Sequence, residues 1–249
     1  MPKTDYRGWI SGLGRTLLEG LLGLALAGCA AAGPDSANDP FEATNRDILA
    51  VNNALDRRLL SPTVRSYLAL PEGLRRGAHK FLHNLALPTI FINDVLQGEP
   101  RRAGDSAARF VVNSSLGVGG LFDPATRMGA SDHSEDFGQT LAVWGVGEGP
   151  FLMRPFLGPS NPRDTLGLAV DTFLLDPTNY IHFKNHLWWS AGRKYFTLLD
   201  LRAQSIDTIE GIQRSSVDYY ASLRSLYRQL RASQIRNGAA EKAPELPDF

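Results

Sequence analysis

The feature that most constrains the fold is an apolar stretch that glycine and proline interrupt repeatedly. Residues 138–160 read GQTLAVWGVGEGPFLMRPFLGPS, which is apolar enough to be buried or to lie in lipid but too broken to form one regular element. Irregular backbone at membrane depth is tolerated only where protein covers it or where it lines a polar cavity. The stretch therefore predicts a channel-lining or gating loop; the alternative is a tight connection between two helices of a soluble protein. The predicted channel or gating loop consists of Trp144, Gly145, Val146, Gly147, Glu148, Gly149, Pro150 and Phe151.

On both sides of this stretch, apolar residues recur at helical spacing. We predict a first helix with Asp39 as its N-cap that ends before Pro62, and a second that opens at Pro71 and stops near Pro88. Further helices are predicted over 90–97 (closed by Gly98), 101–115, 135–144, 166–175 and, as two helices broken near 211–215, over 186–236. We find no strand pattern of useful length, and no segment after residue 28 reaches the roughly 18 apolar residues of a spanning helix. The pattern predicts an all-α protein of many short amphipathic helices, which suits a flat assembly lying in a membrane interface.

The amino terminus has the layout of a bacterial lipoprotein leader. Lys3, Arg7 and Arg15 precede a short apolar run over 21–27, and residues 26–29 read Leu-Ala-Gly-Cys, which looks like a lipobox. We expect cleavage before Cys29 and lipid attachment to it; the alternative is a buried free cysteine. The predicted organisation is a signal peptide at 1–28, a tether at 29–38, one helical domain at 39–236 and a disordered tail at 237–249.

Composition excludes some function classes. The formal net charge is zero and no block of like charge occurs, which argues against nucleic acid as a partner. The single cysteine excludes an intrachain disulfide.

Signatures of catalysis are missing from the sequence. There is no Gly-x-Ser-x-Gly motif and no phosphate-binding loop that ends in Lys-Ser/Thr. Two histidine pairs at helical spacing, His79 with His83 and His182 with His186, have the geometry for a metal but lack the adjacent glutamate of a metalloprotease helix, so we favour interfacial or solvated histidines. The polar run 133–136 is interpreted as a helix cap. We predict no enzyme activity, no cofactor and no metal.

A series of short motifs occurs in order along the chain. The motifs are DPFE (39–42), NR (45–46), QG (97–98), RF (109–110), NS (113–114), LGVGG (116–120), EDFGQTL (135–141), GVGEGP (145–150), LGPS (157–160) and RD (163–164). With them, behind a lipobox, the chain resembles the MlaA (VacJ) family of outer-membrane lipoproteins from residue 39 to about residue 231.

The resemblance implies a flat, ring-like helical protein in the periplasmic leaflet of the outer membrane, with a central amphipathic channel for misplaced phospholipids. It also implies two protein partners, a trimeric outer-membrane porin and a soluble periplasmic lipid carrier similar to MlaC. Two other classes stay open at this point. One is a scaffold lipoprotein of the envelope without lipid transport, and the other is a lipid-cleaving enzyme.

Overall fold

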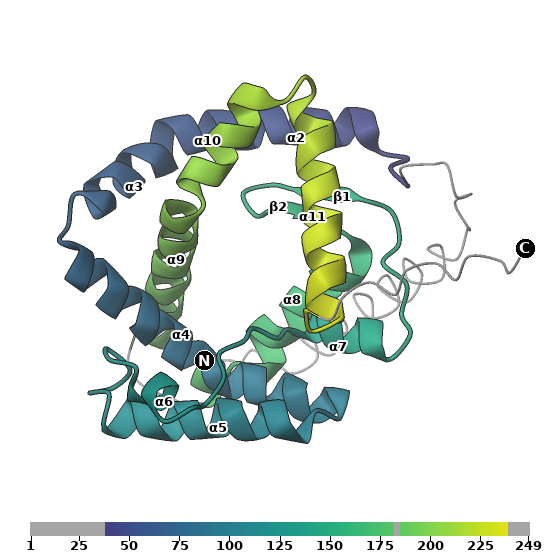
Figure 1. Ribbon diagram of the computed structural model, residues 1–249. Helices are drawn as coiled ribbons and strands as arrows, with labels where there is room; N and C mark the ends of the chain where they lie inside the picture. The colour runs from purple at the N-terminus through teal and green to yellow at the C-terminus, as the bar shows by residue number, and fades with distance from the viewer. Residues whose placement is uncertain (1–37, 182–184, 239–249) are drawn as a thin grey trace, which may run out of the picture.

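The computed structural model describes residues 38–181 and 185–238. In this part of the chain the helices form a ring around an open middle (Figure 1). The fold is all-α, as predicted, apart from one two-stranded antiparallel sheet. Within these residues, no helix has both the length and the hydropathy that crossing a bilayer requires. The predicted leader at 1–28 and the lipid-attachment residue Cys29 lie outside the described residues.

The first half of the chain forms most of the outer wall, and the second half closes the ring (Figure 1). The wall consists of α2 (Glu42–Leu55), the π-helical segment η1 (Asp56–Leu60), α3 (Ser61–Leu68), α4 (Glu72–Gln97) and α5 (Pro100–Ser115). After α6 (Pro124–Arg127) and α7 (Phe137–Val143) come strands β1 (Leu152–Arg154) and β2 (Gly158–Ser160), which pair with Leu152 opposite Ser160. The chain ends with α8 (Pro162–Val170), the π-helical η2 (Asp171–Leu175), the 3-10 helix η3 (Pro177–Tyr180), α9 (His186–Gln204), α10 (Ile206–Ser215) and α11 (Tyr219–Ile235).

Two helix ends predicted at prolines are wrong. The backbone stays helical through Pro62, because η1 precedes it with a wider turn in which the Ser61 N–H donates to the Asp56 carbonyl five residues back. Pro88 lies inside α4, which runs unbroken to Gly98. A proline inside a helix costs about 3 kcal/mol, and the burial of neighbouring Leu87 and Ile90 offsets that penalty.

The start of the first helix and the ends of the last ones also differ from the prediction. Phe41, not Asp39, is the N-cap of α2, and no side chain caps it. Asp39 instead accepts a hydrogen bond from Arg224 Nη1 at 2.6 Å and so joins the first helix to the last. The final third contains three helices, because a break at Ser205 separates α9 from α10. The small β1–β2 sheet was not predicted, since three-residue strands are too short to show alternation.

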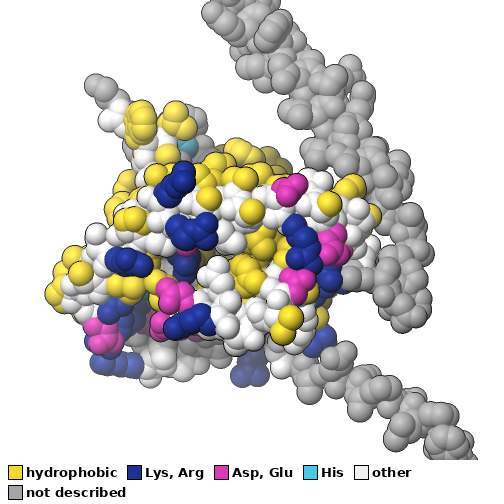
Figure 2. Space-filling view, turned by 90° about the horizontal axis from the view of Figure 1, so that it is seen from above, with side chains coloured by type: hydrophobic (Ala, Val, Ile, Leu, Met, Phe, Trp, Pro, Cys, Tyr) yellow, Lys and Arg dark blue, Asp and Glu magenta, His cyan; other side chains and the backbone are white. Residues whose placement is uncertain are grey.

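Buried apolar side chains form two small clusters in the wall instead of one central core. The clusters are Leu49, Phe151, Met153 and Tyr220, and Val64, Leu199 and Ala203. Many large apolar side chains remain at the surface, Trp188 among them with 77% of its surface exposed. Figure 2 shows the edge seen from above, where Arg and Lys side chains lie beside Asp and Glu with apolar groups between them. This amount of exposed apolar surface indicates contact with an apolar partner or phase.

Candidate functional site

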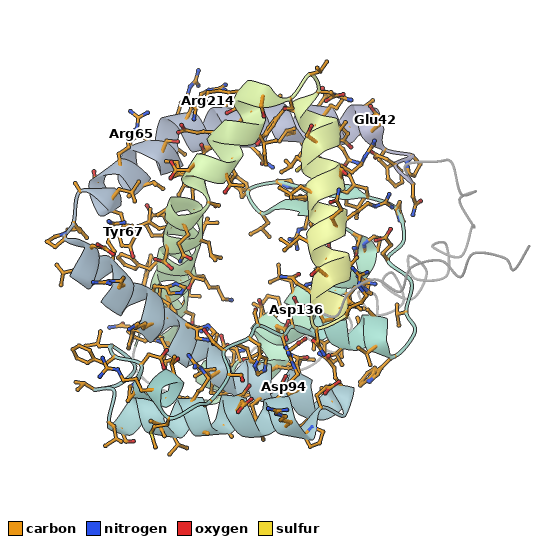
Figure 3. The ribbon with its side chains drawn as sticks, in the orientation of Figure 1. Glu42, Arg65, Tyr67, Asp94, Asp136 and Arg214 are labelled. Atoms are coloured by element: carbon orange, nitrogen blue, oxygen red, sulfur yellow. The ribbon has the colours of Figure 1, made fainter. Side chains whose placement is uncertain are left out.

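A cavity of about 540 Å³ lies within the ring, between α2–η1, the β1–β2 hairpin and helices α9, α10 and α11. Its wall combines apolar and polar side chains. The apolar ones include Leu49, Met153, Phe156, Leu198, Ile209 and Leu223, and the polar ones include Asn52, Asn53, Asp56, Arg202 and Gln213. Figure 3 shows that the side chains leave the middle of the ring open. Such a wall provides contacts for a molecule that has both an apolar and a polar part.

One ion pair in this wall joins the two halves of the chain. Arg202 on α9 donates to Asp56 on η1 through Nε at 2.9 Å and through Nη2 at 3.0 Å. Burial acts to raise the pKa of Asp56, but the hydrogen bonds from Arg202 and Ser61 outweigh it and hold the pKa below its usual value. The carboxylate therefore stays ionised and keeps α9 against the outer wall.

A second, polar pocket of about 200 Å³ lies between α7, α8, α11 and the hairpin. Arg231 on α11 is its central charge. It donates to Asp164 through Nε at 2.8 Å and to Asp136 through Nη1 and Nη2 at 2.6 Å each. Burial alone would lower the pKa of Arg231, but its hydrogen bonds to Asp136 and Asp164 raise it. Figure 3 shows Asp136 beside the end of α11, next to the opening of the ring.

The two helices that carry these carboxylates pack backbone to backbone. Asp136 is the N-cap of α7 and accepts from the Gln139 N–H at 2.9 Å, so the predicted cap is confirmed. A Cβ placed on Gly167 of α8 would lie 2.2 Å from the amide nitrogen of Gly138 in α7. The close crossing brings Asp136 and Asp164 near enough for one guanidinium to bridge them.

Asp171 lies in the same pocket, and its pKa is shifted from the usual value. Burial raises its pKa to about 6, although hydrogen bonds from the Phe137 N–H at 2.9 Å and from Asn93 Nδ2 at 3.0 Å lower it in part. The charge of the pocket therefore changes near pH 6.

The predicted channel or gating loop, 144–151, connects α7 to β1 and runs along the outer side of α11 (Figure 1). Both ends are attached. Trp144 Nε1 donates to the Leu96 carbonyl at 3.0 Å, and its ring packs edge-on against Phe137. Phe151 is buried and makes an edge-on contact with Tyr220.

The middle of this loop has open space around it. Glu148 accepts a hydrogen bond from Arg228 of α11 at 2.7 Å. A Cβ on Gly145 or Gly147 would meet no atom within 4 Å, and Val146 between them is half exposed. Gly145 has a φ of +89°, in the left-handed region, and Gly147 does not. The Gly145 and Val146 N–H groups donate to the Ala142 and Leu141 carbonyls at 2.9 Å each, so the open space at 145–147 is space for side chains beside a backbone that is held to the end of α7.

Ser106, His133 and Asp94 come together in a way that the sequence did not reveal. Ser106 Oγ lies 2.6 Å from Asp94 Oδ2 and 3.1 Å from His133 Nε2. A catalytic triad places serine and carboxylate on opposite nitrogens of the imidazole, whereas here His133 Nε2 faces both. Ser106 and Asp94 are also fully buried, so this cluster holds α4, α5 and the segment before α7 together and is not arranged for attack on a substrate.

The remaining histidines take part in hydrogen bonds of the ring wall. His79 Nδ1 lies 2.8 Å from Asp200 Oδ2, and His83 Nε2 lies 2.9 Å from Asp132 Oδ1. His186 Nε2 lies 2.7 Å from the Thr178 carbonyl, and His182 falls outside the described residues. Over 38–181 and 185–238, no group of three or more potential metal ligands occurs.

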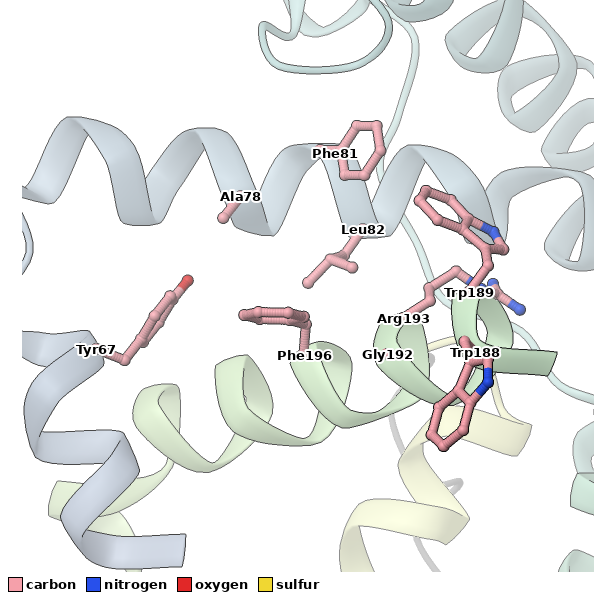
Figure 4. A pocket seen from close by; sticks show the side chains of 9 residues that line it. All are labelled: Tyr67, Ala78, Phe81, Leu82, Trp188, Trp189, Gly192, Arg193 and Phe196. Carbon is pink, nitrogen blue, oxygen red and sulfur yellow. The ribbon is translucent and has the colours of Figure 1, made fainter. Parts of the chain in front are cut away.

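A third cavity, of about 260 Å³, lies between α4 and α9 (Figure 4). Leu82 of α4 and Phe196 of α9 point toward one another across it, and Tyr67 lies at one end. Trp188 and Trp189 lie at the other end. The phenol of Tyr67 donates to Asp200 Oδ1 at 2.8 Å, whereas Arg193, which also lines the cavity, has a buried Nε without a hydrogen-bond partner.

The elements and cavities described above define a helical ring protein with an amphipathic interior. Residues 37–234 match the family model described as MlaA lipoprotein. The chain is 34% identical over 234 residues to the intermembrane phospholipid transport system lipoprotein MlaA of Escherichia coli K12, covering 90% of this chain and 89% of that protein. It is 29% identical over 250 residues to the protein of the same name from Haemophilus influenzae, covering 94% and 96%.

A solved structure supports the same assignment. It was described as the structural basis for maintenance of bacterial outer membrane lipid asymmetry, and it superposes with a TM-score of 0.69 at 33% identity, covering 79% of this chain and 98% of that one. The chain belongs to the MlaA lipoprotein family, as the order of its motifs predicted.

Some residues of the polar pocket escaped the sequence analysis. Asp164 belongs to the RD motif at 163–164, but its partner Arg231 lies on α11, 67 residues away. The available signal was weak, because Arg231 is one of three arginines in α11, with Arg224 and Arg228. Periodicity gives no means of pairing that arginine with a particular carboxylate.

Proposed function

We propose that this chain is an outer-membrane lipoprotein that removes mislocalised phospholipids from the outer leaflet. In this proposal the lipid passes through the ring and is handed to a soluble periplasmic carrier, which maintains the lipid asymmetry of the outer membrane. The transport named for the Escherichia coli and Haemophilus influenzae relatives supports this assignment.

The observation that carries the proposal is the amphipathic wall of the 540 Å³ cavity within the ring. A phospholipid has two apolar tails and a polar head, and burying that head in hydrocarbon is very costly. A passage that offers polar groups such as the Asp56–Arg202 pair beside apolar ones such as Leu198 lowers this barrier.

We further propose that acyl chains on Cys29 hold the ring at the periplasmic face of the outer membrane. Each buried methylene contributes about 0.8 kcal/mol, so several acyl chains give stable attachment. The family resemblance supports a trimeric porin as a neighbour in the membrane and a carrier similar to MlaC as the acceptor. Lipid would move down a gradient that an ATP-driven complex of the inner membrane maintains.

Loop 144–151, none of whose residues lines the 540 Å³ cavity, is proposed to gate this passage from the outer side of α11. The proposal is supported by its construction, with attached ends at Trp144 and Phe151 and unobstructed space around Gly145 and Gly147. In the alternative interpretation the loop is a passive connection.

The test begins with a strain that lacks the gene. We expect more phospholipid in the outer leaflet and a weaker barrier to detergents, measured by accessibility to an outer-leaflet acyltransferase or lipase, and recovery with the wild-type gene. An unchanged lipid distribution in the null strain would favour the scaffold interpretation.

The same strain tests the gate with a matched pair of variants. Gly147→Val should fold and localise normally, because the position has open space and lies outside the left-handed region, yet it should alter transport per folded molecule. Gly145→Val is the comparison variant in which the backbone is strained, because Gly145 has a positive φ. We expect it to lose about 1–3 kcal/mol of stability and to be less abundant. Normal transport per molecule in both variants would refute the gate.

A further inference from the structure

The β1–β2 hairpin separates the two cavities inside the ring wall. Successive residues of a strand point to opposite faces, and β1 follows this rule: Met153 lines the 540 Å³ cavity and Arg154 lines the 200 Å³ polar pocket. Pro159 of β2 lines both. An amphiphile that straddles the hairpin at Pro159 would therefore meet a largely apolar wall on one side and a charged pocket on the other.

Arg154 is the charged residue of this pocket whose guanidinium has donors without hydrogen-bond acceptors. Its Nε and Nη1 atoms are buried, and neither has a hydrogen-bond partner. Its backbone is held, because the carbonyl accepts from Asn52 Nδ2 at 2.9 Å. Burial lowers the pKa of Arg154, although Tyr227 and Asp164 act to raise it. Buried donors without acceptors are costly, so this guanidinium is arranged for an acceptor from outside the chain.

The carboxylates of the pocket already serve other donors. Asp164 accepts from Arg231 at 2.8 Å and from Arg163 at 3.0 Å, and Asp136 accepts from both Nη atoms of Arg231. Asp171 accepts from a backbone N–H and an asparagine amide. Arg231 and Arg163 thus pair with Asp136 and Asp164, while Asp171 accepts from neutral donors, so within the pocket Arg154 is the arginine that forms no ion pair with these three carboxylates and is available to a bound anion.

We propose that Arg154 binds the phosphodiester of a phospholipid headgroup in the polar pocket, while the acyl chains occupy the adjoining 540 Å³ cavity across Pro159. The planar guanidinium fork matches two oxygens of a phosphate and forms charge-assisted hydrogen bonds with them. The inference rests on the proposed function for the identity of the ligand, and it adds the residue and the face of the hairpin that recognise the headgroup.

The test measures equilibrium binding of lipids to the full-length lipoprotein in detergent. The ligands are phosphatidylglycerol, a diacylglycerol with the same acyl chains, and inorganic phosphate. The variants are Arg154→Gln, Arg154→Lys and, as a matched control, Arg65→Gln at an exposed position on α3. We expect Arg154→Gln to raise the Kd for phosphatidylglycerol about tenfold or more, as loss of a charged hydrogen bond requires, and to leave the Kd for diacylglycerol unchanged. Arg154→Lys should retain part of the affinity, and Arg65→Gln all of it.

Three results would overturn the inference. The first is that Arg154→Gln binds phosphatidylglycerol as tightly as the wild-type protein does. The second is that Arg154→Gln loses phosphatidylglycerol and diacylglycerol binding equally, which would indicate a structural role. The third is that inorganic phosphate binds the wild-type protein as tightly as the lipid does. Failure of the proposed function gives a different pattern. In that case the null strain would keep a normal lipid distribution while the purified protein still required Arg154 for phosphatidylglycerol.

Discussion

Gly167→Ala provides a direct test of how the ring wall is built. The added Cβ would lie 2.2 Å from the amide nitrogen and 2.6 Å from the Cα of Gly138. Carbon atoms pack best at about 3.5–4.0 Å, and both obstructing atoms belong to the backbone, so a side-chain rotation gives no relief. Helix α8 must therefore move away from α7 by about 1 Å or more.

The expected loss of stability follows from two contributions. Overpacking of this kind costs about 1–3 kcal/mol. Moving α8 also stretches the bridge in which Arg231 holds Asp136 of α7 and Asp164 of α8, and a hydrogen bond to a charged group contributes about 1.5–3 kcal/mol. The better helix propensity of alanine returns about 1 kcal/mol. We expect a net loss of about 3 kcal/mol, which lowers Tm by about 6–12 °C in a chain of this size.

Thermal unfolding of the purified protein in detergent, followed by circular dichroism, measures this shift. Gly104→Ala is the matched control, because Gly104 is exposed on α5 and its added Cβ meets no atom within 4 Å. The control should be unchanged or more stable by about 0.5–1 kcal/mol. A Gly167→Ala protein that melts with the control would refute the close backbone contact and the reasoning built on it.

Two other predictions concern the pKa of Asp171 and the attachment of the protein to the membrane. The pKa of Asp171 rises from 3.8 to about 6 in the folded state, so the folded protein binds this proton more tightly than the unfolded chain does. The free energy of unfolding therefore falls as the pH rises from about 4 to 6. Asp171→Asn cannot titrate, and the stability of wild type relative to this variant should fall by up to about 3 kcal/mol between pH 4 and pH 7, measured from paired Tm-against-pH curves. Parallel curves would contradict this assignment. Cys29→Ala should remain uncleaved or leave the outer membrane and fail to complement the null strain, and normal sedimentation with normal complementation would show that the lipobox interpretation is wrong.

The sequence by itself determined the features that depend on short-range interactions. Helical spacing over 101–115 predicted α5 to within one residue of its start. Gly98 was recognised as a helix end, and the structure gives it a φ of +75°, which glycine adopts readily. The order of short motifs was enough to indicate the family. A cap such as Asp136 is also readable, since it acts on an amide only three residues away.

The tertiary structure alone decided whether prolines interrupt helices and which charges meet. Pro88 would end an isolated helix, but burial of Leu87 and Ile90 in the wall keeps α4 continuous. Arg231 reaches Asp136 across 95 residues of sequence. That pairing depends on closure of the ring and on the glycine contact that brings α7 and α8 together. The physical reason is that hydrogen-bond periodicity and capping act within a few residues, whereas closing long loops and burying charge in pairs depend on how the whole chain packs.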